Sequence, residues 1–148
     1  MSVLIFGQGA EEARLRALSI GLSSVVFHQH SDLKLARALR VSAVVVIPGC
    51  VGLAVTHGFV HGVPILTRRG QLHGPELEYI EDGCNGLLLP EESEAFFEAL
   101  DAFIDDRALQ RRLSEGAKQT ARTIDMHHMV ATFHGLVSEC LASSTAAS

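Results

Sequence analysis

Long apolar runs, clustered basic residues and paired cysteines are all missing from this chain of 148 residues. Lys and Arg number 12 against 17 Asp and Glu, and because nucleic-acid binding needs clustered positive charge, we expect no nucleic-acid partner. No stretch approaches the roughly 20 apolar residues of a membrane span, and the apolar start Val3–Phe6 meets glycine at once, so we expect neither a span nor a signal peptide. The cysteines Cys50, Cys84 and Cys140 form no CxxC pair, which suits reduced thiols and predicts a cytoplasmic location.

Short apolar runs alternate with helical patterns along the first two thirds of the chain. Val44–Ile47 is the strongest strand signal, because β-branched residues without alternation indicate a strand covered on both faces. Other runs that read as strands are Val3–Phe6, Val25–Phe27, Ile65–Thr67 and Leu87–Leu89. After Pro90 the pattern is helical, with a last helix over Asp125–Leu141 and a frayed tail from Ser143. The sequence therefore predicts an α/β fold, a Rossmann-like three-layer sandwich with about five parallel strands and C-terminal helices, forming one domain over residues 1–148.

A glycine-containing loop, residues 48–53, follows the most buried predicted strand. Ligands of parallel sheets bind at the carboxyl ends of the strands, so this loop is the first place to look for a site. Gly49 and Gly52 allow close approach of the backbone, and a helix begins directly afterwards, an arrangement that suits an anion such as a diphosphate. Taken alone, the loop is a weak signal for a ligand site and fits a tight turn between strand and helix better.

Seven segments of the sequence together match a known pattern. They are Leu4–Gly9, Val26–Phe27, Val46–Leu53, Gly62–Thr67, Gly74–Ile80, Glu81–Leu88 and Phe96–Arg122. In this order and spacing, over roughly residues 2–140, they resemble retaining glycosyltransferases of the GT-B fold (family-four type, group 1). In that family they correspond to the C-terminal domain, which binds the nucleotide-sugar donor.

The resemblance assigns roles to particular positions. It implies that Gly49, Cys50, Val51, Gly52 and Leu53 form the loop over the donor diphosphate. His57 and Glu76 would face the donor pocket, and Gln29 and His30 would lie in the loop that borders the base. It implies a nucleotide or nucleotide-sugar ligand, no further cofactor and no metal.

Two departures from the family pattern stand out. Gly49 and His57 occupy the positions of two glutamates that usually contact the donor sugar and the ribose, which indicates altered sugar recognition. The acceptor domain and the basic linking strand of a full enzyme have no counterpart in these residues, so we expect no catalysis by the chain alone, and an acceptor-domain polypeptide as partner. The alternative is a nucleotide-binding or interaction module that forms a homodimer, through the open face with Leu72 or through the last helix with Phe133.

Some residues admit several interpretations. His57 and His61 are four apart and could share a metal, line the donor pocket, or have a structural role. Arg68 and Arg69 could approach phosphates or lie in an exposed loop.

Overall fold

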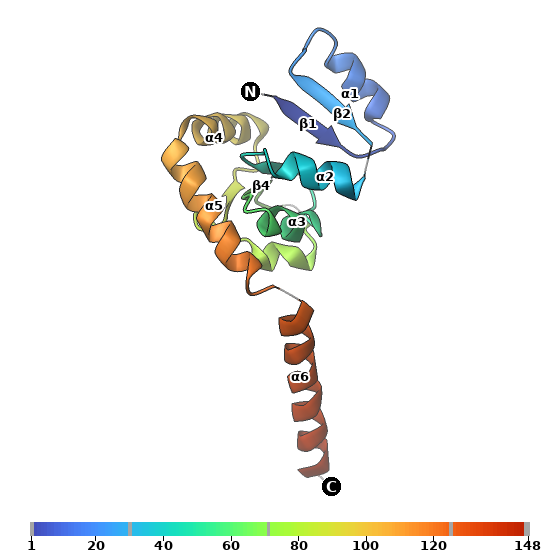
Figure 1. Ribbon diagram of the computed structural model, residues 1–148, viewed down its shortest axis with the longest axis vertical. Coiled ribbons are helices and arrows are strands. Elements are labelled where there is room, and N and C mark those ends of the chain that lie inside the picture. Colours follow the sequence, from blue (N-terminus) through green and yellow to red (C-terminus); the bar gives the residue numbers. More distant parts are fainter. Residues whose placement is uncertain (1, 30, 71, 125, 147–148) are drawn as a thin grey trace. The chain divides into compact units, whose positions relative to one another are not determined.

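The computed structural model describes residues 2–29, 31–70, 72–124 and 126–146 (Figure 1). The chain divides into two compact units, Met1–Ser42 and Ala43–Ser148. Each unit has its own parallel sheet, with two strands in the first and three in the second.

The first unit consists of β1 (Val3–Phe6), α1 (Glu12–Leu18), β2 (Val25–His28) and α2 (Asp32–Leu39). β1 and β2 pair in parallel, from Val3 opposite Val25 to Phe6 opposite His28. The rings of Phe6 and His28 stack with their centroids 5.1 Å apart. Since α1 connects two parallel neighbours, the unit is a βαβ arrangement followed by a helix, as the alternating sequence pattern predicts.

The second unit carries the remaining elements. They are β3 (Val45–Ile47), α3 (Ala54–Val60), β4 (Ile65–Arg68), the 3₁₀ helix η1 (Pro75–Tyr79), β5 (Gly86–Leu89), α4 (Ser93–Asp105), α5 (Arg107–Ala121) and α6 (Met126–Ala146). The strands pair in parallel in the order β3-β4-β5, so β4 is the central strand. Asp106 ends α4 and caps α5, because its Oδ1 accepts hydrogen bonds from the amides of Ala108 and Leu109 at 2.9 Å.

The core of the second unit lies on both faces of β4. Ile65 and Leu66 are adjacent in the strand, so their side chains point to opposite faces, and both are fully buried. Ile65 belongs to a cluster with Val51, Val55, Phe59, Ile80 and Ala117. Leu66 belongs to a second cluster with Leu89, Phe96, Phe103 and Leu113. Helices therefore cover the sheet on both sides, as the unalternated apolar strands predict.

The α/β fold with five parallel strands and C-terminal helices is confirmed. The strands form two separate sheets, one of two strands and one of three. The predicted end of the last helix at Leu141 is wrong, since α6 continues to Ala146. Only small residues follow Leu141, and none of them is a glycine or a proline that would stop a helix. None of the helices in the described ranges has the length and apolar content that a bilayer crossing requires.

The turn before β5 is held by a buried amide. Asn85 is 1% exposed; its Oδ1 accepts from the Glu81 amide at 2.8 Å, and its Nδ2 donates to the Tyr79 carbonyl at 2.8 Å and to Thr120 Oγ1 at 2.9 Å. A Cβ at the neighbouring Gly86 would run into the carbonyl oxygen of Ile65. Asn85 thus ties the end of η1 to α5, and Gly86 lets β5 lie close to β4.

Candidate functional site

The loop between β3 and α3 is anchored at its middle and open on either side. Val51 is 1% exposed and belongs to the core cluster around Ile65. A Cβ built on Gly49 or on Gly52 would meet nothing within 4 Å. The two glycines therefore border open space, while Val51 between them is fixed in the core.

The loop after β4 is hydrogen-bonded to this glycine loop. The amide of Val51 donates to Nδ1 of His73 over 3.3 Å, and the amide of Gly74 donates to the Val51 carbonyl over 3.1 Å. Nε2 of His73 lies 2.9 Å from the carbonyl oxygen of Arg68, the last residue of β4. The carboxyl ends of two adjacent strands are thus joined through one histidine ring.

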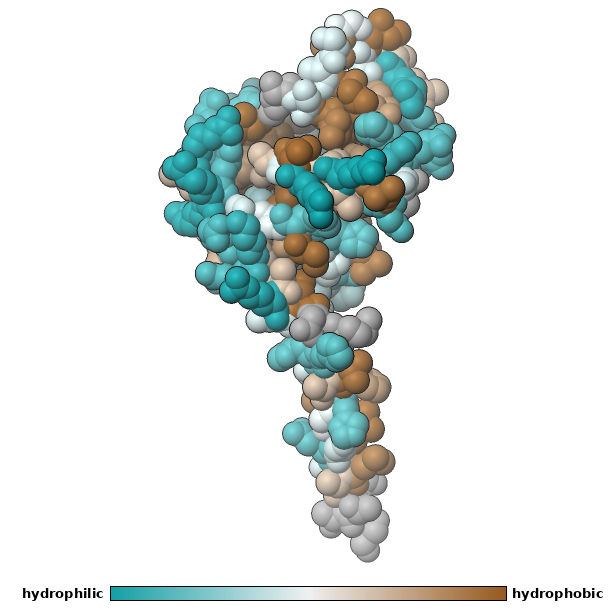
Figure 2. All heavy atoms as spheres, in the orientation of Figure 1, coloured by the Kyte–Doolittle hydropathy of each residue, from teal (hydrophilic) through white to brown (hydrophobic). Residues whose placement is uncertain are grey.

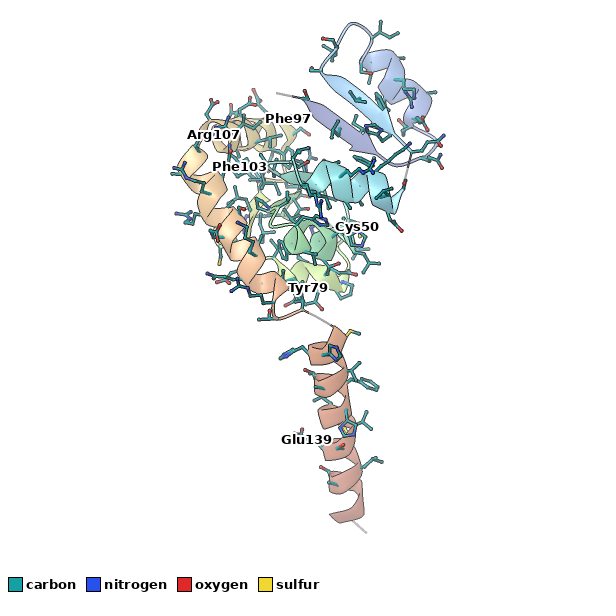
Figure 3. All side chains as sticks on the ribbon, in the orientation of Figure 1. Cys50, Tyr79, Phe97, Phe103, Arg107 and Glu139 are labelled. Carbon is teal, nitrogen blue, oxygen red and sulfur yellow. The ribbon has the colours of Figure 1, made fainter. Side chains whose placement is uncertain are left out.

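Further contacts hold the start of the loop and leave its end free. The buried Thr67 Oγ1 donates to the Gly49 carbonyl over 3.4 Å. Cys50 is exposed, and its thiol donates to the Val51 carbonyl over 3.4 Å (Figure 3). Among the described residues, the amides of Gly52 and Leu53 have no hydrogen-bond partner. These two donors are available to a ligand.

The predicted residues of α3 lie at the surface. Leu53, just before the helix, is 67% exposed, and His57 is exposed one turn further on. Nδ1 of His61 lies 3.0 Å from the carbonyl oxygen of His57, so the His61 ring contacts the backbone of His57. The described residues contain no group of three or more His, Cys, Asp or Glu arranged to hold a metal ion.

Glu76 lies in η1 beside the joined loops. A Cβ at Gly74 would stand 2.6 Å from Glu76 Oε2 and 2.9 Å from the Val51 carbonyl oxygen. The carboxylate is therefore folded back toward the segment that contacts the glycine loop. The structure thus places all the predicted positions of the second unit at the carboxyl-end loops of β3 and β4 and on the elements that follow them.

The two arginines at the end of β4, Arg68 in the strand and Arg69 just after it, make contacts with other parts of the protein. Arg68 donates from Nη2 to Ser93 Oγ over 3.2 Å, and its guanidinium lies 4.8 Å from the centre of the Phe96 ring. Arg69 forms an ion pair with Asp82. Both side chains hold neighbouring segments of the protein, which favours a structural role over phosphate binding.

The predicted base-binding residues belong to the first unit. Gln29 is exposed directly after β2, and His30 lies outside the described residues. His73 does not stand out in the sequence, because one histidine in a polar loop forms no pattern. Its one signal is its position just before Gly74 and Pro75, in a segment that carries the family resemblance.

The chain matches a known protein family. A family model described as "Glycosyl transferases group 1" matches residues 1–106. No curated protein matches the chain at a significant level.

Solved structures share the fold. The GtfA/B complex superposes with a TM-score of 0.76 at 22% identity, covering 94% of this chain and 29% of that one. The pneumococcal O-GlcNAc transferase GtfA, crystallised with UDP and GlcNAc, gives 0.76 at 19% identity, covering 95% of this chain and 30% of that one. Anabaena Alr3699/HepE with UDP-glucose gives 0.69 at 19% identity, covering 96% and 41%. The chain therefore spans well under half the length of these structures. Because the family model matches more than half of the 148 residues, the chain belongs to the group 1 glycosyl transferases.

Proposed function

We propose that residues 1–148 act as the donor-binding half of a retaining glycosyltransferase, and that the ligand is a nucleoside diphosphate sugar. The observation that carries the proposal is the glycine loop, which has a buried Val51 between two glycines that face open space. The free amides of Gly52 and Leu53 suit the oxygens of a diphosphate, because backbone N–H groups bind anions well. Family membership supports the same assignment.

Recognition of the sugar and the base would come from side chains around this loop. The exposed His57 can donate or accept a hydrogen bond with a ribose hydroxyl. Glu76 would face the donor, and Gln29 and His30 would border the base. Structures of the fold relatives contain UDP or UDP-glucose, so uridine is the first base to test.

The binding experiment is a thermal-shift screen with uridine, guanosine and adenosine diphosphates and their sugar conjugates, followed by calorimetry on the best ligand. A ligand that binds the folded state raises its melting temperature by mass action. Gly52→Val should weaken the best ligand about tenfold or more, because two methyl groups enter the open space beside the loop. Gly135→Val in α6 is the matched control, since its Cβ also meets nothing within 4 Å. Equal affinity for the wild type and a folded Gly52→Val variant would remove these residues from the site.

Transfer of the sugar would need an acceptor-binding partner. Catalysis in such enzymes depends on positioning and charge stabilisation in a closed cleft, and this chain covers only 29 to 41% of the length of its fold relatives. We expect the purified chain to bind the donor but not to transfer its sugar. The assay is run under reducing conditions like those of the cytoplasm, which suit the free cysteines. Sugar transfer to any acceptor at enzyme-like rates by the purified chain would contradict this.

A second role, self-association, is favoured by exposed apolar side chains. Figure 2 shows apolar side chains along one side of α6. The exposed ones are Met129, Val130, Phe133, Leu136, Val137 and Leu141. Leu72, in the loop after β4, is 91% exposed and offers the other surface.

Light scattering at micromolar concentration tests the dimer. A mass of 15.9 kDa would mean a monomer and refute this second role. If a dimer forms, Phe133→Glu and Leu72→Glu distinguish the surfaces, because only the change in the real interface should dissociate it.

A further inference from the structure

His73 is held in one tautomer by two backbone groups. The amide of Val51 can only donate, so Nδ1 of His73, 3.3 Å away, must be the unprotonated acceptor. In the neutral ring the proton then lies on Nε2, which donates to the Arg68 carbonyl over 2.9 Å. Both ring nitrogens are therefore used, and both bonds go to backbone of other segments.

These two bonds tie the glycine loop to the end of the central strand. Arg68 ends β4, which is fixed in the sheet by pairing on both sides. Val51 lies in the loop after the adjacent strand β3. The ring thus links the end of a strand that is fixed in the sheet to Val51 in the glycine loop.

The segment around His73 is shaped for this contact. The next amide, that of Gly74, returns a hydrogen bond to the Val51 carbonyl over 3.1 Å, so Val51 is held on both its backbone polar groups. A side chain at Gly74 would crowd that carbonyl at 2.9 Å, which explains a glycine there. The histidine and glycine therefore act together on one residue of the loop.

We propose that His73 is a positioning residue of the donor site: through Nδ1 and Nε2 it fixes the backbone of residues 49–53 in the conformation that receives the donor diphosphate. The inference rests on the proposed donor-binding function and adds to it a residue that need not touch the ligand. Without the ring, the Val51 amide loses its acceptor, and the adjacent free amides of Gly52 and Leu53 lose their fixed direction. A preorganised loop binds more tightly because less ordering remains to be done on binding.

Two readouts that need no ligand test the first half of the inference. Long-range ¹H–¹⁵N spectra of the histidine rings should show the Nε2–H tautomer for His73. Amide hydrogen exchange of Val51, whose N–H donates to the ring, should be faster in His73→Ala than in the wild type, while His61→Ala leaves it unchanged. His61 is the matched control, because its Nδ1 also contacts a backbone carbonyl, at 3.0 Å, outside this loop. The opposite tautomer, or unchanged exchange in His73→Ala, would overturn the inference.

Calorimetry with UDP or the best diphosphate from the screen tests the second half. His73→Ala should bind about tenfold or more weakly, since the loop is no longer held in place and must be ordered on binding. His73→Asn, whose Oδ1 can replace Nδ1 as acceptor for the Val51 amide, should recover most of that loss. Wild-type affinity in a folded His73→Ala variant, or no recovery with Asn, means that the histidine only supports the fold. Absence of nucleotide binding by the wild type would instead contradict the proposed function, with the exchange result still deciding whether His73 fixes the loop.

Discussion

Replacing Asn85 with alanine tests whether the Asn-Gly pair holds the fold or serves a ligand. The side chain is 1% exposed and makes three hydrogen bonds, to the Glu81 amide, the Tyr79 carbonyl and Thr120 Oγ1. Each bond contributes about 1 kcal/mol net, and the buried partners left behind add a desolvation cost of about 1–2 kcal/mol. We expect the free energy of unfolding to fall by about 4–5 kcal/mol in Asn85→Ala, a large share of the roughly 5–15 kcal/mol typical of a domain.

Urea unfolding followed by far-UV circular dichroism measures this loss, since the chain has no tryptophan for fluorescence. With a slope of about 2 kcal/mol per molar urea, the midpoint should fall by about 2 M. Gln119→Ala is the control, because it removes an exposed amide from the same helix as Thr120 and should change stability by less than about 0.5 kcal/mol. A loss below about 1 kcal/mol for Asn85→Ala, or intact stability with lost nucleotide binding, would refute the structural role.

Other changes test the packing, the thiols and the open loop. A Cβ on Gly116 would collide with the Cys84 carbonyl, so Gly116→Ala should cost about 1–3 kcal/mol in urea unfolding; a neutral result would mean that α5 can move. Partial burial and the nearby Glu81 raise the pKa of the Cys84 thiol above its ordinary value, so Cys84 should react with iodoacetamide more slowly than the exposed Cys50, and Glu81→Gln should speed its reaction. Because the folded-state pKa is raised, this thiol's contribution to stability is complete below the unfolded pKa and is lost as the pH rises through the folded one. Gly49→Glu should change the free energy of unfolding by less than about 0.5 kcal/mol, because a Cβ at position 49 would meet nothing within 4 Å. A larger loss of stability would show that the loop needs glycine for folding.

Much of the second unit could be predicted from local patterns. The run Val44–Ile47 gives a buried strand because its β-branched side chains fit a sheet covered on both faces, and β3 spans Val45–Ile47. Glycine and proline after it mark the loop that carries the candidate site. The turn residues Asp82 and Gly83 likewise precede β5, with Gly83 at a φ of 78° that favours glycine.

What the sequence could not give depends on contacts between distant segments. His73 acquires its role only when β3 and β4 lie side by side and bring Val51 within hydrogen-bond distance, although the two residues are 22 positions apart. The Asn85 contact with Thr120 spans 35 positions, so its structural role is equally invisible in a local pattern. The same holds for Arg68, which reads as an exposed basic residue until Ser93 and Phe96 are placed beside it.

The residues that produce the family resemblance fall into two physical groups. Asn85, Gly86 and Gly116 are constrained by backbone or buried partners, so the fold of this chain requires them whatever it binds. Gly49 and Gly52 have no such neighbours, and the fold would accept other residues in their place. The departure at Gly49 is therefore not a consequence of packing, because a longer side chain would meet open space. If the proposed donor site is correct, the residue at such a free position is set by the ligand, and the glycine at position 49 predicts a different sugar contact at the same loop.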